Sequence, residues 1–236
     1  MNEESLQKLR DEGIMLQQDG ERYVFRLCVS GGYMQGATLA EVAKLADQFG
    51  NGYVHLTTRQ GIEIPDVSAE NIPSLREALL QVGQETGGTG RRVRTIVACP
   101  GTRCRYGTVN VQDLARRIRK AVRHRDGLPH KFKIAASGCP NSCAKPTEND
   151  LGLMGVGKGQ CQVFVGGKMG RCPRRADKLE GTVSAQGAHD LIGSVLDWYV
   201  EHGRPKERFG TVIDRVGLNA LCGTLSEAGF DLTSPV

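Results

Sequence analysis

The sequence predicts an α+β fold in two parts, and three observations lead to this prediction. Residues 1–86 carry strand and helix patterns in the order β-α-β-β-α, which is typical of a compact α+β layer. A polar, glycine-rich stretch over 84–90 follows and is the best candidate for a domain boundary. Later residues alternate short apolar strands with amphipathic helices, and two of those strands lead into cysteine-bearing turns. We therefore expect one domain over 1–86 and a second over 87–236.

Local signals predict each element of the first domain. Residues 1–20 are expected to form a short amphipathic helix and a turn, and 23–30 have strand composition. Thr38 and Glu41 have the spacing of a capping box, which predicts a helix from Thr38 to Phe49. Strands over 53–59 and 61–64 and a helix over 72–82 complete this part.

The second domain is expected to contain three strands and two helices. The strands are predicted over 94–99, 131–137 and 160–165. The helices are predicted over 111–123, with a strongly basic outer face, and over 185–201. The last ~15 residues give little signal.

Composition limits the possible classes of protein. The chain has 236 residues, of which 39% are hydrophobic and 24% charged, as in an ordinary globular protein. No apolar run approaches the roughly 20 residues of a membrane span, and the N-terminus lacks the layout of a signal peptide. We therefore expect a cytoplasmic protein, in which cysteines stay reduced and clustered ones serve as metal ligands or catalysts. No P-loop, serine nucleophile elbow or HExxH motif is present.

Two cysteine pairs are the strongest chemical signal. Cys99 and Cys104 have the spacing C-x4-C, Cys139 and Cys143 have C-x3-C, and both pairs are surrounded by Gly and Pro. Structural zinc sites usually show C-x2-C or similar pairs. The four corners of a cubane lie farther apart than the ligand positions around one zinc ion, so wider spacings suit it. The spacing favours an iron–sulfur cluster and leaves zinc, or four unrelated thiols, as alternatives.

Four basic residues form a candidate anion site. Lys131 and Lys133 share one face of a predicted strand that leads into Cys139. Arg59 and Arg94 lie on predicted strands that end in turns. Such a set of cations would bind a small oxyanion and hold proton donors beside it. The alternative is a sheet with one solvent-exposed side.

Four segments resemble those of the sulfite and nitrite reductases that carry sirohaem coupled to a [4Fe–4S] cluster. They read VRTIVACPGTRCRYG, PHKFKIAASGCPNSC, TTRQGIEI and VFVGGKMGR, and the resemblance extends from about Tyr23 to Gly217. It implies a ferredoxin-like α+β domain over 1–86, followed by an α/β sirohaem- and iron–sulfur-binding domain over 87–236. Larger members carry two copies of this half. The chain resembles one copy, as in the low-molecular-weight, assimilatory-type sulfite reductases.

The resemblance also implies residue roles. Cys99, Cys104, Cys139 and Cys143 would bind the cluster, and Cys143 would be shared with the sirohaem iron. The cations around the substrate would be Arg59, Arg94, Lys131 and Lys133, and the contacts to the macrocycle would come from Gln60, Arg103, Arg105, Asn141 and Arg171. The family usually spaces its first cysteine pair C-x5-C, whereas this chain has C-x4-C.

The implied function is the six-electron reduction of sulfite to sulfide. No flavin or nicotinamide fingerprint is present, so electrons would come from a separate donor such as ferredoxin or a cytochrome. Reduction of nitrite to ammonia at the same site is one alternative. A [4Fe–4S] electron-transfer module without sirohaem is another. A zinc-stabilised anion- or nucleic-acid-binding domain that uses the basic helix 115–123 is a third. We expect no nucleic acid or membrane partner, and either a monomer or a homodimer.

Overall fold

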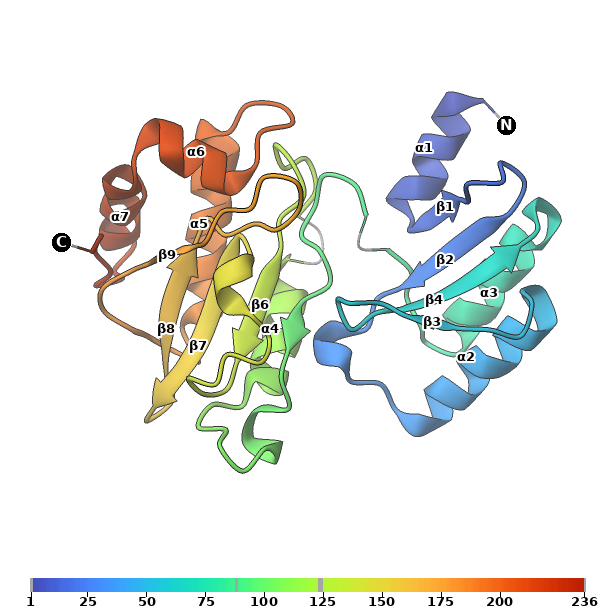
Figure 1. The fold of residues 1–236 in the computed structure, drawn as a ribbon, viewed down its shortest axis with the longest axis horizontal. Helices are drawn as coiled ribbons and strands as arrows, with labels where there is room; N and C mark the ends of the chain where they lie inside the picture. Colours follow the sequence, from blue (N-terminus) through green and yellow to red (C-terminus); the bar gives the residue numbers. More distant parts are fainter. Residues whose placement is uncertain (1, 88, 123–124, 236) are drawn as a thin grey trace. The chain divides into compact units, whose positions relative to one another are not determined.

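A computed structural model of the chain describes residues 2–87, 89–122 and 125–235. The chain forms two compact units, Met1–Gly90 and Arg91–Val236 (Figure 1). Two sequence predictions involve residues outside the described ranges, namely Gly88 in the boundary stretch and Arg123 at the end of the basic helix.

The first unit contains a four-stranded antiparallel sheet with the order β1-β2-β4-β3. Its helices α2 and α3 lie on one face of this sheet (Figure 1). The elements are α1 (Glu3–Asp11), β1 (Ile14–Leu16), β2 (Tyr23–Leu27), η1 (Ser30–Gly32), α2 (Gly36–Phe49), β3 (His55–Leu56), β4 (Ile62–Val67), η2 (Ala69–Asn71) and α3 (Ile72–Gln81).

Side-chain alternation explains the core of the first unit. Along β2, Tyr23, Phe25 and Leu27 are buried, while Val24 and Arg26 between them are half-buried. Successive residues of a strand point to opposite faces, so the three buried side chains share one face. They belong to the same apolar core as residues of α2 and α3.

Two predictions for the first unit are wrong in detail. The strand expected over 53–59 is only His55–Leu56, an edge strand that pairs with β4 alone. The capping box does not form. Helix α2 begins at Gly36 with Gln35 as N-cap and no side-chain cap, so Thr38 lies inside the helix.

The second unit contains a six-stranded mixed sheet with the order β10-β8-β7-β6-β5, and β9 pairs with β8. The strands β5, β6 and β7 are parallel, whereas β8 runs antiparallel to β7. The elements are β5 (Val97–Ala98), η3 (Gly101–Arg103), α4 (Val111–Val122), β6 (Ile134–Ser137), η4 (Pro146–Glu148), β7 (Leu151–Gly157), β8 (Gln160–Val165), β9 (Asp177–Lys178), β10 (Val183–Ser184), α5 (Ala188–His202), α6 (Phe209–Val216) and α7 (Leu218–Glu227).

The core of the second unit lies between this sheet and its helices. Helices α4 and α5 lie behind the strands in Figure 1, and residues of both belong to one apolar cluster with the strands. Four buried aromatic residues pack within it, and Phe132 lies 5.1 Å from Phe209 and 5.8 Å from Tyr199 between ring centroids. Trp198 contacts Phe209 edge-on. Such pairs stabilise a core beyond the area that they bury.

Of the three strands predicted for the second unit, one has the predicted bounds and two are shorter than predicted. Strand β8 has the predicted bounds, and the strand predicted over 131–137 begins only at Ile134. The strand predicted over 94–99 is reduced to Val97–Ala98. Strand β7 and helices α6 and α7 were not predicted.

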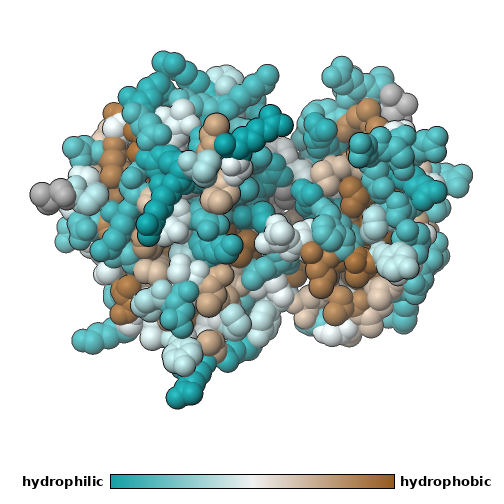
Figure 2. Space-filling view, in the orientation of Figure 1, coloured by the Kyte–Doolittle hydropathy of each residue, from teal (hydrophilic) through white to brown (hydrophobic). Residues whose placement is uncertain are grey.

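The surfaces of both units are mainly hydrophilic on the face drawn in Figure 2. Over the described ranges, the helices lack the length and apolar character that crossing a bilayer requires.

Candidate functional site

The two cysteine pairs lie in neighbouring turns at the carboxyl ends of β5 and β6. These strands are parallel, and Ala98 pairs with Ala136. The N–H of Cys99 donates to the carbonyl of Ala136 at 3.2 Å, so Cys99 leaves β5 beside the end of β6. Cys139 follows two residues after β6. Ligand sites are often built where parallel strands end. We call this region, residues 99–109 and 138–144, the cysteine end.

Backbone hydrogen bonds hold the two turns of the cysteine end together. The N–H groups of Gly138 and Gly101 point at the Sγ of Cys99, at 3.1 and 3.4 Å. The N–H groups of Thr108 and Val109 donate to the carbonyl of Gly138 at 2.8 and 3.2 Å. Backbone N–H groups aimed at sulfur are typical partners of cluster-bound cysteines. The surroundings of Cys99 therefore fit a cluster ligand.

Glycines allow this close packing. A Cβ on Gly155 of β7 would lie 2.5 Å from the carbonyl oxygen of Gly138, and a Cβ on Gly107 would collide with the backbone of Gly101. Gly101 also has φ +62°, a conformation that costs glycine little. Side chains at these positions would push the two turns apart.

The second turn brings Cys143 back to the end of β6. Ser142 has φ +58° and donates its N–H to the carbonyl of Cys139 at 3.2 Å. The N–H of Ala144 then donates to the Oγ of Ser137 at 3.0 Å. Asn141, also in this turn, is exposed.

The four cysteines are suited to a cluster by their chemistry, because thiolates are the usual ligands of iron–sulfur clusters. All eight cysteines are free, and Cys99 and Cys139 are buried whereas Cys104 and Cys143 are exposed. Among residues 2–87, 89–122 and 125–235, no three His, Cys, Asp or Glu side chains are grouped so that they could hold a metal ion. A cubane takes its ligands at separate iron atoms and does not require such a group.

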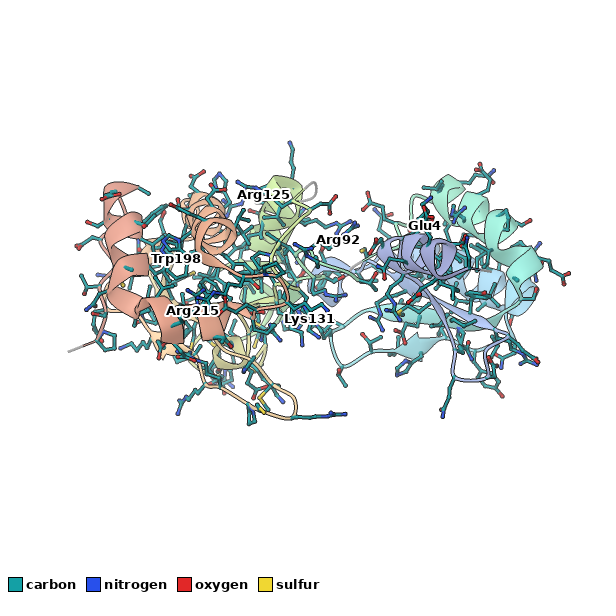
Figure 3. The ribbon with its side chains drawn as sticks, turned by 90° about the horizontal axis from the view of Figure 1, so that it is seen from above. Glu4, Arg92, Arg125, Lys131, Trp198 and Arg215 are labelled. Atoms are coloured by element: carbon teal, nitrogen blue, oxygen red, sulfur yellow. The ribbon has the colours of Figure 1, made fainter. Side chains whose placement is uncertain are left out.

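A second group of predicted residues lies just before β5 and β6. Val93 and Phe132 form a parallel bridge, and the N–H of Arg94 donates to the carbonyl of Phe132 at 2.7 Å. Phe132 is fully buried, whereas Lys131 and Lys133 on either side are half-buried. Both lysines lie in an extended segment that precedes β6, rather than within the strand as predicted. Figure 3 labels Lys131 in this segment.

Two residues that sequence reasoning missed support this segment. The carboxylate of Asp150, 0% exposed, accepts the N–H of Lys133 at 2.8 Å. Each of its two oxygens also accepts a hydrogen bond from the Nη2 of Arg208, at 2.9 and 2.8 Å, and the Arg208 side chain is 14% exposed. We call Arg94, Lys131, Lys133, Asp150 and Arg208 the cation end.

Charges at the cation end influence one another. Burial lowers the pKa of Lys131, and Arg208 and Arg94 lower it further, while Asp150 acts in the opposite direction. Burial and the neighbouring cations Lys131, Arg208 and Arg94 also lower the pKa of His130. A lysine with a lowered pKa releases a proton more readily than a free lysine. The cation end can therefore bind an anion and supply a proton to it.

The cysteine end and the cation end lie at opposite ends of β6. Lys133 immediately precedes this strand and Gly138 immediately follows it. At about 3.3 Å per residue, their Cα atoms are roughly 16 Å apart. In Figure 1 the green turn after β5 lies at the arrowhead end of β7, and the orange turn after β8 lies at the other end.

The remaining predicted site residues lie in several parts of the chain. Arg103 and Arg105 are exposed at the cysteine end, and Arg105 lies 5.7 Å from the ring centroid of Tyr106. Arg171 is exposed in the segment that follows β8. Arg59 and Gln60 belong to the first unit, in the tight turn between β3 and β4, where Gln60 has φ +61°.

Two family models match the chain. The model described as the nitrite and sulphite reductase 4Fe-4S domain matches residues 89–228. The model described as the nitrite/sulfite reductase ferredoxin-like half domain matches residues 15–82. The first match covers most of the second unit and begins two residues before it, and the second match lies within the first unit.

Relatives include reductases of both anions. The chloroplastic ferredoxin–nitrite reductase of Zea mays is 34% identical over 205 residues, which are 83% of this chain and 34% of that protein. The assimilatory ferredoxin-dependent nitrite reductase of Haloferax mediterranei is 30% identical over 93% of this chain and 44% of that protein. The coenzyme F420-dependent sulfite reductase of Methanocaldococcus jannaschii is 34% identical over 61% of this chain and 23% of that protein. The chain spans less than half the length of these three relatives.

Two solved structures have the same fold. The NirA protein of Mycobacterium tuberculosis matches with a TM-score of 0.84 at 19% identity, over 100% of this chain and 49% of that chain. Dissimilatory sulfite reductase I matches with a TM-score of 0.79 at 15% identity, over 91% of this chain and 70% of that chain.

Proposed function

Because this chain belongs to the nitrite and sulphite reductase family, we propose that it reduces sulfite to sulfide with six electrons from a separate donor. The observation that carries this proposal is the pairing of a four-cysteine end with a cation end in one 4Fe-4S domain. The electron donor would be a ferredoxin or a cytochrome, and the protein would be located in the cytoplasm.

The cysteine end would hold the cofactors. Cys99, Cys104, Cys139 and Cys143 would bind a [4Fe–4S] cluster, and Cys143 would be shared with the iron of sirohaem. When bound, these groups supply the electrons and the metal to which sulfite binds. Exposed Cys104 and Cys143 are accessible to a group that arrives after folding. The buried, hydrogen-bonded backbone around Cys99 would hold the cluster on that side.

Polar residues would orient the macrocycle. Arg103, Arg105 and Asn141 lie at the cysteine end, and their exposed side chains suit the carboxylates of sirohaem. Only the resemblance supports a role for Gln60 and Arg171, because Gln60 lies in the first unit and Arg171 in the segment that follows β8.

The cation end would act on the substrate anion. Arg94, Lys131 and Lys133 would neutralise the sulfite oxygens, with Arg59 of the first unit as a fourth cation. As an oxygen leaves, positive groups stabilise the charge that develops on it, and Lys131 can protonate it. Arg94 cannot serve as a proton donor at neutral pH, so its role is to bind and orient the anion.

Nitrite reduction to ammonia is the second candidate function. The observation that favours it is the likeness to two ferredoxin-dependent nitrite reductases over most of this chain. Nitrite is also a small anion that needs cations, electrons and protons.

The test is a steady-state assay of anaerobically reconstituted protein with each anion and a viologen donor. We expect sulfite to be the better substrate, and K131A and K133A to reduce turnover at least tenfold with little change in melting temperature. K178A, which changes an exposed lysine of β9, is the matched control and should leave turnover unchanged. Equal losses of turnover and stability in K131A would contradict the substrate role. A preparation that binds sirohaem and reduces neither anion would contradict the function.

A further inference from the structure

A buried glutamine of helix α4 bonds directly to the backbone of Cys99. The Nε2 of Gln112 donates to the carbonyl of Cys99 at 2.9 Å. Gln112 is 4% exposed, and the other five buried residues of α4 are apolar. Burying an amide costs free energy unless it finds hydrogen-bond partners, whereas a methionine would fill a similar space without that cost. The helix therefore carries a polar group where packing alone does not require one.

The start of α4 is fixed, so the amide of Gln112 has a defined place. Helix α4 begins at Val111, two residues after the cysteine end. The side chain of Asn110 accepts the N–H of Asp113 at 3.1 Å, which is the usual capping bond of a helix N-terminus. The N–H of Leu114 donates to the carbonyl of Asn110 at 3.1 Å. Gln112 thus lies in a helical turn that is anchored to the chain before it.

The bond from Gln112 ties the backbone of Cys99 on its second side. On the first side, the N–H of Cys99 donates to the carbonyl of Ala136 in β6 at 3.2 Å. The Sγ of Cys99 meanwhile faces the backbone N–H groups of Gly138 and Gly101, at 3.1 and 3.4 Å. Without the amide, the peptide unit that follows Cys99 would be free to rotate. The Sγ would then lose its alignment with these two N–H groups.

We propose that Gln112 is a positioning residue for the iron–sulfur cluster, and that its amide keeps the sulfur of Cys99 in line with the two N–H groups that donate to it. The inference rests on the proposed function, because it requires that Cys99 binds a cluster. Hydrogen bonds to the sulfurs of a cluster stabilise its reduced, more negative state and so raise its reduction potential. Replacing a residue that orients a metal ligand typically changes metal affinity by roughly 10–100-fold. Gln112 should therefore affect both the retention of the cluster and its potential.

The chain offers a matched control in Gln162 of strand β8. This residue is 8% exposed, and its Nε2 donates to the backbone carbonyls of Leu179 and Gly181, the latter at 3.3 Å. Strand β7 separates β8 from β6 in the sheet, and the two carbonyls belong to the segment that follows β9. Q112M and Q162M therefore remove the same amide from two buried places. Methionine keeps the length of the side chain and makes no such donation.

The test compares reconstituted wild type, Q112M and Q162M. Urea unfolding should show that both variants are less stable than wild type, because each loses buried hydrogen bonds to carbonyls. Release of iron to a chelator should be about tenfold faster in Q112M than in wild type, and unchanged in Q162M. A redox titration followed by electron paramagnetic resonance should give a lower cluster potential in Q112M alone.

Faster iron release and a lower potential in Q112M alone support the proposal. Wild-type release and potential in Q112M would overturn it. Equal changes in Q112M and Q162M would also overturn it, because they would follow from a general loss of stability. If Q112M does not fold, Q112E takes its place, since a carboxylate keeps the shape of the amide and lacks its donor. The same outcomes then decide.

These measurements separate the inference from the proposed function. Wild type that carries a cluster and reduces neither anion would contradict the function, and the comparison of Q112M with Q162M would still decide the role of Gln112. Active wild type together with unchanged cluster properties in Q112M would contradict the inference alone. Wild type without iron would overturn both.

Discussion

The cysteine end and the cation end are stabilised in different ways. The cysteine end is held by backbone groups, with glycines where another chain segment approaches, and two of its thiols are exposed. The cation end is held by side-chain charge, with Asp150 fully buried and bound to Arg208 and to the backbone of Lys133. The difference suits the two roles proposed for these ends. A rigid backbone cradle suits a bulky inorganic group, whereas a buried carboxylate can hold several positive groups near one another.

The largest effect is expected from removing the carboxylate of the cation end. D150A leaves the guanidinium of Arg208 buried without its partner, which should reduce the free energy of unfolding by about 3–5 kcal/mol. Urea unfolding measures this loss. The double variant D150A/R208M removes both charges and should regain most of the stability. A double variant as unstable as D150A would show that the ion pair is not the cause.

A smaller loss is expected at the cysteine end. In G155A the new Cβ meets the carbonyl oxygen of Gly138 at 2.5 Å, and such overpacking typically costs about 1–3 kcal/mol. Iron content should fall with stability, because the displaced turn carries Cys139. G193A is the matched control, since a Cβ there meets nothing within 4 Å and alanine favours the interior of helix α5. If both variants bind iron equally well, the close packing of the two turns is not needed for the cluster.

The pH dependence of turnover should reflect the pKa of Lys131 at the cation end. In the proposed function, Lys131 must be protonated to bind the anion and donate a proton, so turnover should fall as pH rises through its pKa. Burial, Arg208 and Arg94 lower that pKa below 10.5, which places the fall at lower pH than for a free lysine. R208Q removes a lowering influence and should move the fall to higher pH. R215Q removes a cation of α6 that pairs with Glu207, and it should leave the profile unchanged (Figure 3 labels Arg215 and Lys131). A fall at the same pH in R208Q and wild type would refute this influence of Arg208.

The smallest effect is expected from a solvent-accessible ion pair beside the buried one. The hydrogen bond from Arg215 lowers the pKa of Glu207 from 4.5 to about 2. The pair therefore contributes stability above pH 4.5, and this contribution is lost as pH falls toward 2. Unfolding midpoints of wild type should decline across this range relative to those of E207Q. Parallel midpoints for the two proteins would mean that the pair adds nothing.

The sequence predicted the regular elements better than their ends. Strand β8 was predicted over 160–165 and has these bounds, and helix α3 begins at the predicted residue. Strand β7 was missed because Gly152 and Gly155 resemble a loop. The structure needs both glycines, since a Cβ on either would collide with backbone that lies on the strand. Helix α2 begins at Gly36, before its apparent capping box, and its N-cap residue Gln35 makes no side-chain capping bond.

The site was predictable only in part. Motif spacing and resemblance identified the cysteines and lysines, whose roles remain proposals. Asp150 and Arg208 could not be paired from sequence, because they are 58 residues apart and neither belongs to a recognisable motif. The distance in space between Lys133 and Cys139 was also not predicted. These residues are close in the sequence, but an extended strand lies between them and places them far apart in space.

The most direct test of the account is the visible spectrum and iron–sulfide analysis of anaerobically prepared wild type and C143S. We expect Soret and red bands with cluster iron and sulfide in wild type, and loss of the coupled spectrum in C143S. Wild-type protein without iron, or C143S with the complete wild-type spectrum, would contradict it.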